Sequence, residues 1–361
     1  MKERIKDHLR NLTNLVGVSG SEQEVVRYMN EHLLAAADEV NVDHNGNVIA
    51  VKHGTSPGPK LMIGAHSDEV GFSVKSIQED GYLYFDKIGV VSDQLLQGRK
   101  VWISSRKIPG VMGIKAGHLQ TAEESRQVKP LRDCYIDIGA SSKEEAEAIG
   151  IKIGDPIVFQ SDFMELSNTD LISTKSVDNR ISCAILIELF HQLKGKDFAG
   201  TVYGVVTVQE EVGLRGVASA AFTIDPDYAI ILDTIPSGDT PDIDTEKVLP
   251  VFIGKGPACP VGDGVFGWGS YIHPKVREMI EEQSEKVQIP IQYVSLIGEN
   301  YSTDAAALTT IGKGVPVGVL AIPRRYSHSP VELVNLRDAV DVLKVVKGII
   351  GDNGKKSLSF I

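Results

Sequence analysis

Apolar residues recur along the chain at two different spacings, and these spacings predict its helices and strands. Near the start, Ile5, Leu9 and Leu12 follow one another every three or four residues, as on one face of a helix. Ser21 and Glu24 stand at the spacing of a capping box, which predicts a second helix from there to about residue 37. Similar patterns predict further helices over residues 179–193, 274–287 and 336–350, with shorter ones near residues 217 and 305.

Short apolar runs between turn residues predict the strands. Residues 60–65 follow a Pro-Gly-Pro turn and suit a buried central strand. Val42 and Val48 flank Asn45-Gly46, which predicts a hairpin with a type I′ turn. Strand-like runs also occupy residues 201–209, 228–232, 248–253, 291–296 and 315–322. Their alternation with helices predicts an α/β protein with a mixed open sheet that helices cover on both faces.

The pattern changes between residues 71 and 164. Six short strand-like runs follow one another there, separated by Gly, Asp and Lys turns, and residues 142–149 form the one convincing helix. We therefore predict a small inserted β-barrel or sandwich over residues 71–164, and a second domain built from residues 1–70 and 165–361. Residues 117–133 are the longest polar stretch of the insert, and loops of this length are usually functional. They are a candidate oligomer contact or lid.

Length, composition and charge narrow the class of protein. A chain of 361 residues exceeds the roughly 250–300 residues at which single cores stop growing, which supports two domains. A hydrophobic content of 42% with 24% charged residues describes a soluble globular protein. The net charge of −11 argues against a nucleic-acid partner, which would require clustered Lys and Arg.

The N-terminal segment and the cysteines bear on the compartment. The first residues lack the apolar centre of a signal peptide, and no apolar run approaches the roughly 20 residues of a membrane span. Cys134, Cys183 and Cys259 are odd in number and widely spaced, so neither a disulfide framework nor a thiolate zinc site is expected. We expect a soluble protein of the reducing cytoplasm, without a membrane partner.

Carboxylates and imidazoles stand where the predicted strands end. A buried ionised carboxylate must be bound to something, because an isolated charge in a low dielectric is very unfavourable. In open α/β sheets the functional site lies beyond the carboxyl ends of the strands. The candidate ligands that follow strand-like runs are His66, Glu210, Glu211, Asp233 and His328, and Asp178 precedes the helix 179–193.

The kinds of ligand point to particular metal ions. Two imidazoles with several carboxylates suit zinc, cobalt or manganese better than calcium, which prefers an all-oxygen shell. A single catalytic zinc has three protein ligands, so five convergent ligands indicate two divalent ions that share a bridging carboxylate. Asp68 lies two residues after His66 and can fix its ring as a hydrogen-bond acceptor. One of Glu210 and Glu211 would bind metal, and the other would take a proton from metal-bound water.

Each of these residues also has a simpler explanation. A single His or Asp is more often a loop residue, and an Asp before a helix, like Asp178, is usually a cap. The metal site is favoured because five such residues fall at the ends of separate elements in one half of a sheet. Other chemistries lack their motifs: the glycines of residues 262–269 do not directly follow a predicted strand, as a nucleotide-binding GxGxxG would, and there is no GxxxxGK[ST] and no G-x-S-x-G elbow.

Several segments together resemble the M42 metallo-aminopeptidases, the group of glutamyl and tetrahedral aminopeptidases. The resemblance extends from the first helices to the last. The segments that carry it are His66-Ser67-Asp68, Ser176-Val177-Asp178-Asn179-Arg180, Gln209-Glu210-Glu211-Val212-Gly213, Leu232-Asp233 and Arg325-Tyr326-Ser327-His328-Ser329-Pro330. The resemblance implies a zinc-exopeptidase-like catalytic domain and an inserted β-domain for assembly, often into dodecamers.

The resemblance also implies a role for each site residue. Asp178 would bridge two divalent ions, most readily zinc or cobalt, with manganese an alternative. One ion would bind His66 and Asp233, and the other Glu211 and His328. Glu210 would be the general base and Asp68 would orient His66. The implied reaction is hydrolysis of N-terminal residues from peptide substrates through a metal-bridging water.

Other functions fit parts of the sequence. A metal-dependent deacylase or carboxypeptidase would use the same ligands. A β-1,4-glucanase needs two carboxylates roughly 5 to 9.5 Å apart across a sugar bond, and adjacent Glu210-Glu211 suits that poorly. A non-catalytic scaffold that keeps the site is a further alternative. Arg324, Arg325 and Lys255 are candidates to pair with an acidic substrate side chain, although each is more often a solvated surface charge.

Overall fold

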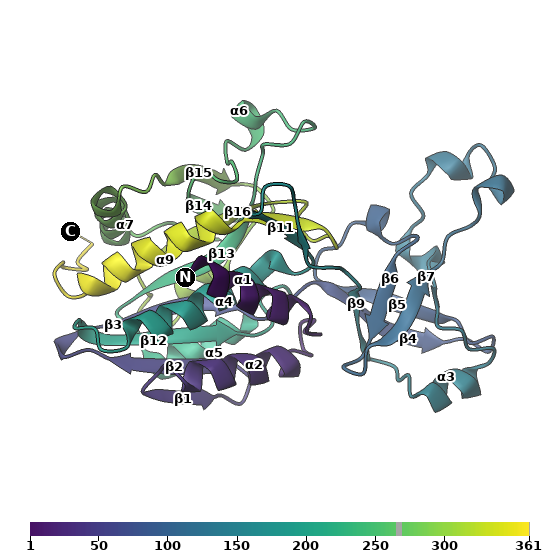
Figure 1. Cartoon of the computed structure of the whole chain (residues 1–361), viewed down its shortest axis with the longest axis horizontal. Coiled ribbons are helices and arrows are strands. Elements are labelled where there is room, and N and C mark those ends of the chain that lie inside the picture. The colour runs from purple at the N-terminus through teal and green to yellow at the C-terminus, as the bar shows by residue number, and fades with distance from the viewer. Residues whose placement is uncertain (265–268, 361) are drawn as a thin grey trace.

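The computed structural model describes residues 1–264 and 269–360, within which eleven strands form one mixed sheet (Figure 1). These strands are β1 (Glu39–Val42), β2 (Val48–His53), β3 (Ser56–His66), β10 (Met164–Glu165), β11 (Leu171–Thr174), β12 (Ala199–Thr207), β13 (Tyr228–Pro236), β14 (Ala258–Gly264), β15 (Gln292–Ile297), β16 (Val317–Arg325) and β17 (Glu332–Asn335). The main path of the sheet runs β1-β2-β12-β3-β13-β16-β17-β11-β10. The four central strands β12, β3, β13 and β16 are parallel, so their carboxyl ends meet at one edge.

Helices cover both faces of the sheet, as the alternation of elements predicts. One core is formed with α1 (Lys2–Thr13), α2 (Gln23–Leu34), α4 (Val177–Leu193), α7 (Pro274–Val287) and α9 (Leu336–Gly351). The other core is formed with α5 (Arg215–Ile224) and α8 (Asp304–Leu308). Nearly every residue of α4 is buried, because this helix packs on the sheet and is itself covered by α1, α2 and α9.

The insert is a closed antiparallel barrel in the order β4-β5-β8-β7-β6-β9, which lies beside the sheet (Figure 1). Its strands are β4 (Gly71–Ile77), β5 (Leu83–Ile88), β6 (Lys100–Ile103), β7 (Ile108–Met112), β8 (Ile136–Asp137) and β9 (Pro156–Phe159). Phe72 packs edge-on against Phe85 and Phe159, with ring centroids 5.2 and 5.3 Å apart, in a core separate from that of the sheet. The predicted fold class is confirmed.

Two local features of the barrel region bear on the predictions. Helix α3 (Lys143–Ile149) begins where expected, because the Ser142 hydroxyl accepts a hydrogen bond from the backbone N–H of Glu145. Residues 117–133 carry three short 3₁₀ turns, at Gly117–Leu119, Glu124–Arg126 and Leu131–Asp133. Most side chains of this stretch are exposed. Among residues 1–264 and 269–360, every helix is too short or too polar to cross a lipid bilayer.

Three local predictions are wrong. The hairpin of β1 and β2 has a longer turn than type I′, in which the Asp43 carboxylate accepts the N–H groups of three following residues. Helix α2 starts at Gln23 without a side-chain cap, and the Glu24 carboxylate instead accepts the N–H of Val16. The run 248–253 is no strand, and its first residue is the last residue of the short helix α6 (Thr245–Val248).

Candidate metal centre

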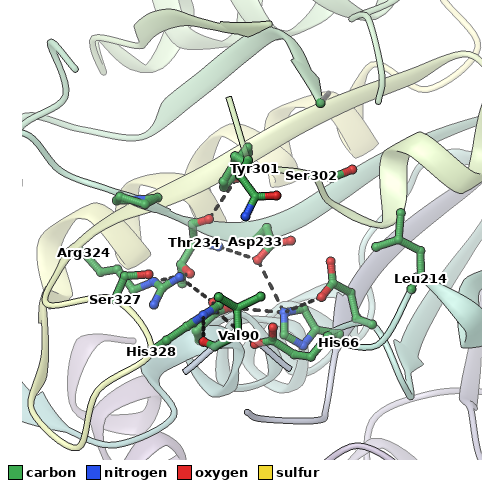
Figure 2. A pocket seen from close by; sticks show the side chains of 17 residues that line it. His66, Val90, Leu214, Asp233, Thr234, Tyr301, Ser302, Arg324, Ser327 and His328 are labelled. Carbon is green, nitrogen blue, oxygen red and sulfur yellow. Dashed lines mark hydrogen bonds and ion pairs between the residues drawn. The ribbon is translucent and has the colours of Figure 1, made fainter. Parts of the chain in front are cut away.

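The predicted site residues meet at the carboxyl edge of the parallel strands (Figure 2). His66 is the last residue of β3, and Glu210 and Glu211 follow the end of β12. Asp233 lies within β13, which continues to Pro236, so it is not at a strand end as expected. His328 follows β16, and Asp178 is the second residue of α4.

Asp178 lies between the two imidazoles. Its Oδ1 is 3.2 Å from Nε2 of His66, and its Oδ2 is 3.3 Å from Nε2 of His328. Its backbone is not helical, although it stands in the first turn of α4. Each carboxylate oxygen of Asp178 therefore faces a different histidine.

Ligand atoms gather in three groups whose members lie within 4.8 Å of one another: His66, Asp178 and Asp233; Asp178, Glu211 and His328; and His66, Glu210 and Glu211. In the first group, Nε2 of His66 is 3.6 Å from Asp233 Oδ1. In the second, Nε2 of His328 is 3.5 Å from Glu211 Oε1. Glu210 is farther from His66 Nε2, at 3.9 Å. Asp178 is shared by the first two groups.

The cluster concentrates negative charge in a buried place. Burial raises the pKa of Glu210 well above its ordinary value and that of Glu211 to about 8. Burial alone would lower the pKa of His328, but the facing Glu211 carboxylate and then Asp178 raise it to about 9. In His66, too, the effect of burial is outweighed by Glu210 and the other carboxylates, which raise its pKa. The side chains therefore hold protons that bound cations would replace.

The donor set fits divalent ions of the zinc, cobalt or manganese type. Imidazole nitrogens and carboxylate oxygens are the ligands that these ions accept together. Oε1 of Glu211 is buried without a hydrogen-bond partner. A buried polar atom without a partner is uncommon, and a bound cation would satisfy this one.

Asp68 holds the segment that carries the two glutamates. Its Oδ1 accepts the backbone N–H of Glu210 at 3.0 Å, and its Oδ2 accepts that of Glu211 at 3.1 Å. Its Oδ1 is also 3.5 Å from Nδ1 of His66, which has no hydrogen-bond partner. Strand β12 ends at Thr207, and Gln209 has a φ of +56°, so the chain turns there. This turn lets two adjacent glutamates reach one site.

The structure differs from the sequence interpretation at Arg324, and it adds Glu332 to the site. Arg324 is only 3% exposed, not a solvated surface charge, and its guanidinium donates to Asp178 Oδ2 at 2.5 Å. Glu332, which the sequence analysis missed, pairs with Arg324 and accepts the backbone N–H groups of Asp178 (3.0 Å) and His328 (2.7 Å). The signal for it in the sequence is a carboxylate between two apolar residues at the start of β17. Arg325 instead pairs with Asp239, and Lys255 is exposed.

The barrel region supplies a hydrogen bond to the site. Nδ1 of His328 lies 2.8 Å from the backbone carbonyl oxygen of Val90, so Nδ1 carries the proton and donates it. Nε2 is thereby left free toward Asp178 and Glu211. Val90 follows β5, and a backbone contact of this kind leaves no signal in the sequence.

A cavity of about 580 Å³ opens onto the cluster. It is lined by the metal-site residues together with side chains from several loops, among them Val90, Leu214, Thr234 and Tyr301 (Figure 2). A ligand of a few residues can therefore reach the carboxylates and imidazoles from solvent.

Known proteins are similar to this chain in sequence and in architecture. Residues 46–345 match the family model described as M42 glutamyl aminopeptidase. Lysyl aminopeptidase of Pyrococcus furiosus is 36% identical over 346 residues, which cover 95% of each chain. An aminopeptidase of the archaeon Desulfurococcus kamchatkensis superimposes with a TM-score of 0.91 at 34% identity, over 98% of this chain and 96% of that one.

A further solved structure bears on assembly. The TET1 peptidase of Pyrococcus horikoshii, which can assemble into a tetrahedron or a large octahedral shell, superimposes with a TM-score of 0.83 at 32% identity. The match covers 96% of this chain and 99% of that one. With the family model matched over most of its length, the chain belongs to the M42 peptidase family and is a hydrolase that acts on peptides.

Proposed function

We propose that the protein is a dinuclear-metal aminopeptidase that removes N-terminal residues from peptides. The observation that carries this proposal is the placement of Asp178, whose two oxygens face two different imidazoles. A carboxylate shared in this way by two groups of ligands is the arrangement expected of a bridging ligand.

Five residues would hold the two ions. His66 and Asp233 would bind one ion, Glu211 and His328 the other, and Asp178 both. When bound, the ions supply Lewis-acid polarisation of the scissile carbonyl and lower the pKa of an attacking water. Asp68 positions the two glutamates through their backbone N–H groups and stands beside the His66 ring.

Glu210 is the proposed general base. It lines the cavity, and its carboxylate lies farther from an imidazole nitrogen than the carboxylates of the proposed ligands do. Its carboxylate would take a proton from the attacking water and pass it to the leaving nitrogen as the C–N bond breaks.

Metal removal and blocked substrates test the proposal together. The chain would be treated with a chelator, refilled with zinc, cobalt or manganese, and assayed on peptides with free and with N-acetylated amino ends. We expect activity to be lost and restored, with two ions bound per chain and only free amino ends accepted. Cleavage of acetylated substrates would indicate a deacylase, release of C-terminal residues a carboxypeptidase, and chelator-insensitive cleavage of cellulose a glucanase.

We further propose that residues 71–164 form an assembly domain and that residues 1–70 and 165–361 form the catalytic domain. The closed barrel has its own hydrophobic core, and it contacts the rest of the chain through the Val90 hydrogen bond and a small cluster that joins Val158 to Val16 and Val18. The related TET1 peptidase assembles into closed shells. This chain would assemble likewise into a homo-oligomer, with a dodecamer as the expected form.

A further inference from the structure

We propose that the enzyme selects peptides whose first residue has an uncharged side chain. This inference rests on the proposed aminopeptidase function. It concerns the cavity of about 580 Å³ that opens onto the metal centre, where the first residue of a substrate would have to lie.

The described lining of this cavity offers no free charge to a substrate. Apart from the proposed ligands and Glu210, its only charged residue within the described part of the chain is Arg324. The remaining lining side chains are apolar or neutral, among them Val90, Leu214, Thr234, Asn300, Tyr301 and Ser302. The sequence also has no charged residue between Gly264 and Gly269.

Each of the three guanidinium nitrogens of Arg324 already has a hydrogen-bond partner. Its Nε donates to the Thr234 hydroxyl at 2.7 Å, one terminal nitrogen donates to Asp178 at 2.5 Å, and the other donates to Glu332. Only 3% of the residue is exposed. An acidic substrate side chain would have to displace a buried carboxylate to pair with it, which is strongly unfavourable.

Other charged residues close to the lining in the sequence or the structure lie outside the cavity. Arg325 is held by two hydrogen bonds to the Asp239 carboxylate, at 2.9 and 2.7 Å. Arg215 and Glu299 adjoin the lining residues Leu214 and Asn300 in the sequence, but both are exposed and neither lines the cavity. Apart from the metal-site residues and the paired Arg324, the described lining therefore holds neither a basic nor an acidic counterpart for a substrate charge.

The absence of a counterpart decides the selectivity. A Lys or Glu side chain that enters the cavity loses hydration and gains no partner, whereas an uncharged side chain loses much less. Specificity is a difference between two such free energies, so it can arise from rejection alone. In the loaded enzyme the carboxylates of the proposed ligands would be bound to the two ions, and the Glu210 carboxylate would face the attacking water, so none of them is offered to a Lys side chain.

A panel of aminoacyl chromogenic substrates with the metal-loaded enzyme tests the inference. We expect kcat/KM for Leu, Met and Ala derivatives to exceed that for Glu, Asp, Lys and Arg derivatives by roughly tenfold or more. A Glu or Lys derivative hydrolysed as fast as the best neutral one would overturn the inference and leave the proposed function intact. If no derivative is hydrolysed by enzyme with two bound ions, both fall.

A matched pair of variants tests where the selectivity lies. Leu214 lines the cavity and has a φ of +57°, a conformation that Asn and Asp adopt more readily than other non-glycine residues. Leu214→Asp places a charge in the cavity, and Leu214→Asn is its neutral control. We expect the ratio of Lys to Leu hydrolysis to be roughly tenfold higher in the Asp variant than in the Asn variant. Equal ratios in two folded variants would contradict the assignment.

The exposed neighbours provide a second control. Arg215→Gln and Glu299→Gln should leave the order of substrates unchanged, because neither side chain lines the cavity. A shift in that order for either variant would show that its charge reaches the substrate, and would overturn the inference.

Discussion

Glu210 and Glu211 are neighbours in the chain, yet their surroundings differ. Glu211 faces His328 within one group of ligands, whereas Glu210 stands 3.9 Å from His66. We expect Glu210→Gln to bind two ions normally and to lose about 10²- to 10⁴-fold in kcat, because it removes the proton acceptor. Metal content by elemental analysis and kcat on one substrate check this.

The neighbouring residue is the matched control. Glu211→Gln should lose metal as well as activity, since it removes a proposed ligand. A Glu210→Gln enzyme with substantial turnover would contradict the assigned role.

Glu332 touches three parts of the site without being a proposed ligand. It accepts the N–H groups of Asp178 and His328 and pairs with Arg324. Glu332→Gln puts an amide where donors converge, so we expect metal affinity to fall by about 10- to 100-fold. Metal titration followed by calorimetry checks this. Unchanged metal affinity in a folded variant would contradict the positioning role.

At this scale, the sequence predicts ligands better than their supports. Most of the five proposed ligands, and Asp68, stand where a strand ends or a helix begins, a pattern that can be read along the chain, whereas Asp233 lies within β13. Glu332 and Arg324 act through partners that are distant in the chain or hidden by burial. The Val90 carbonyl has no side-chain identity to detect.

The ends of α1, β3 and α4 are joined by a buried ion-pair network. Glu69, just after β3, pairs with Lys175 at 2.6 Å and with Arg180 at 3.2 Å, and Lys175 also donates to the Leu15 carbonyl. Glu69→Gln leaves two buried cations without their counter-ion, which should lower the free energy of unfolding by about 3 kcal/mol. Thermal unfolding by calorimetry measures the loss.

Glu165 provides the control for this network. It is about one-third exposed and pairs with Lys6 at 3.4 Å and Arg10 at 3.1 Å. Because exposed pairs contribute little, Glu165→Gln should change stability by less than about 1 kcal/mol. Equal losses in the two variants would mean that the network is no stronger than a surface pair.

Helix α9 is attached to the loop before β14 by one buried carboxylate. Asp338 accepts the N–H groups of Gly254 (2.6 Å) and Gly256 (2.9 Å), and burial raises its pKa to about 7 despite these bonds. The folded state then binds a proton that the unfolded state has released. Stability from this group is therefore present below about pH 4, the ordinary Asp pKa, and is lost as pH rises through 7.

Asp338→Asn should remove this dependence. We expect the fall in melting temperature between pH 5 and pH 8 to be smaller in the variant than in the native chain. An identical fall in both would show that Asp338 does not titrate in this range.

Among the elements, those with a clear period were predicted and the exceptions have local causes. Helices α7 and α9 lie almost where the 3.6-residue pattern places them. The type of the hairpin turn was predicted wrongly because the Asp43 side chain accepts hydrogen bonds from the backbone of a longer loop. Strands β14 and β17 were missed, since the first is rich in Gly and Pro and the second carries a buried charge.

At the scale of the whole molecule, the exposed loop of the barrel can be tested as an assembly contact. Leu119 and Val128 are large apolar residues of residues 117–133 and are 64% and 51% exposed. If they are covered in an oligomer, Leu119→Asp with Val128→Asp should reduce the mass measured by light scattering from that of about twelve chains to a smaller species. Phe222→Asp, on α5 and 80% exposed, is the control and should leave the mass unchanged.

The same double variant separates the two roles predicted for this loop. An intact assembly with an altered KM would favour a lid over an assembly contact.

The overall architecture could be predicted from the sequence, because a series of short strands marks the barrel. How the subunits meet could not, since nothing in one chain's periodicity records a partner's surface.

Through its hydrogen bond to the Val90 carbonyl, the His328 imidazole connects the barrel region with the proposed metal centre. Its Nε2 faces the proposed metal and its Nδ1 is held by the loop that follows β5. A displacement of the barrel must then change the position of the His328 ring relative to the proposed ion. By reciprocity, metal occupancy favours one barrel position by the same free energy. Loading of the site and closure of the oligomer are thus expected to behave as linked equilibria.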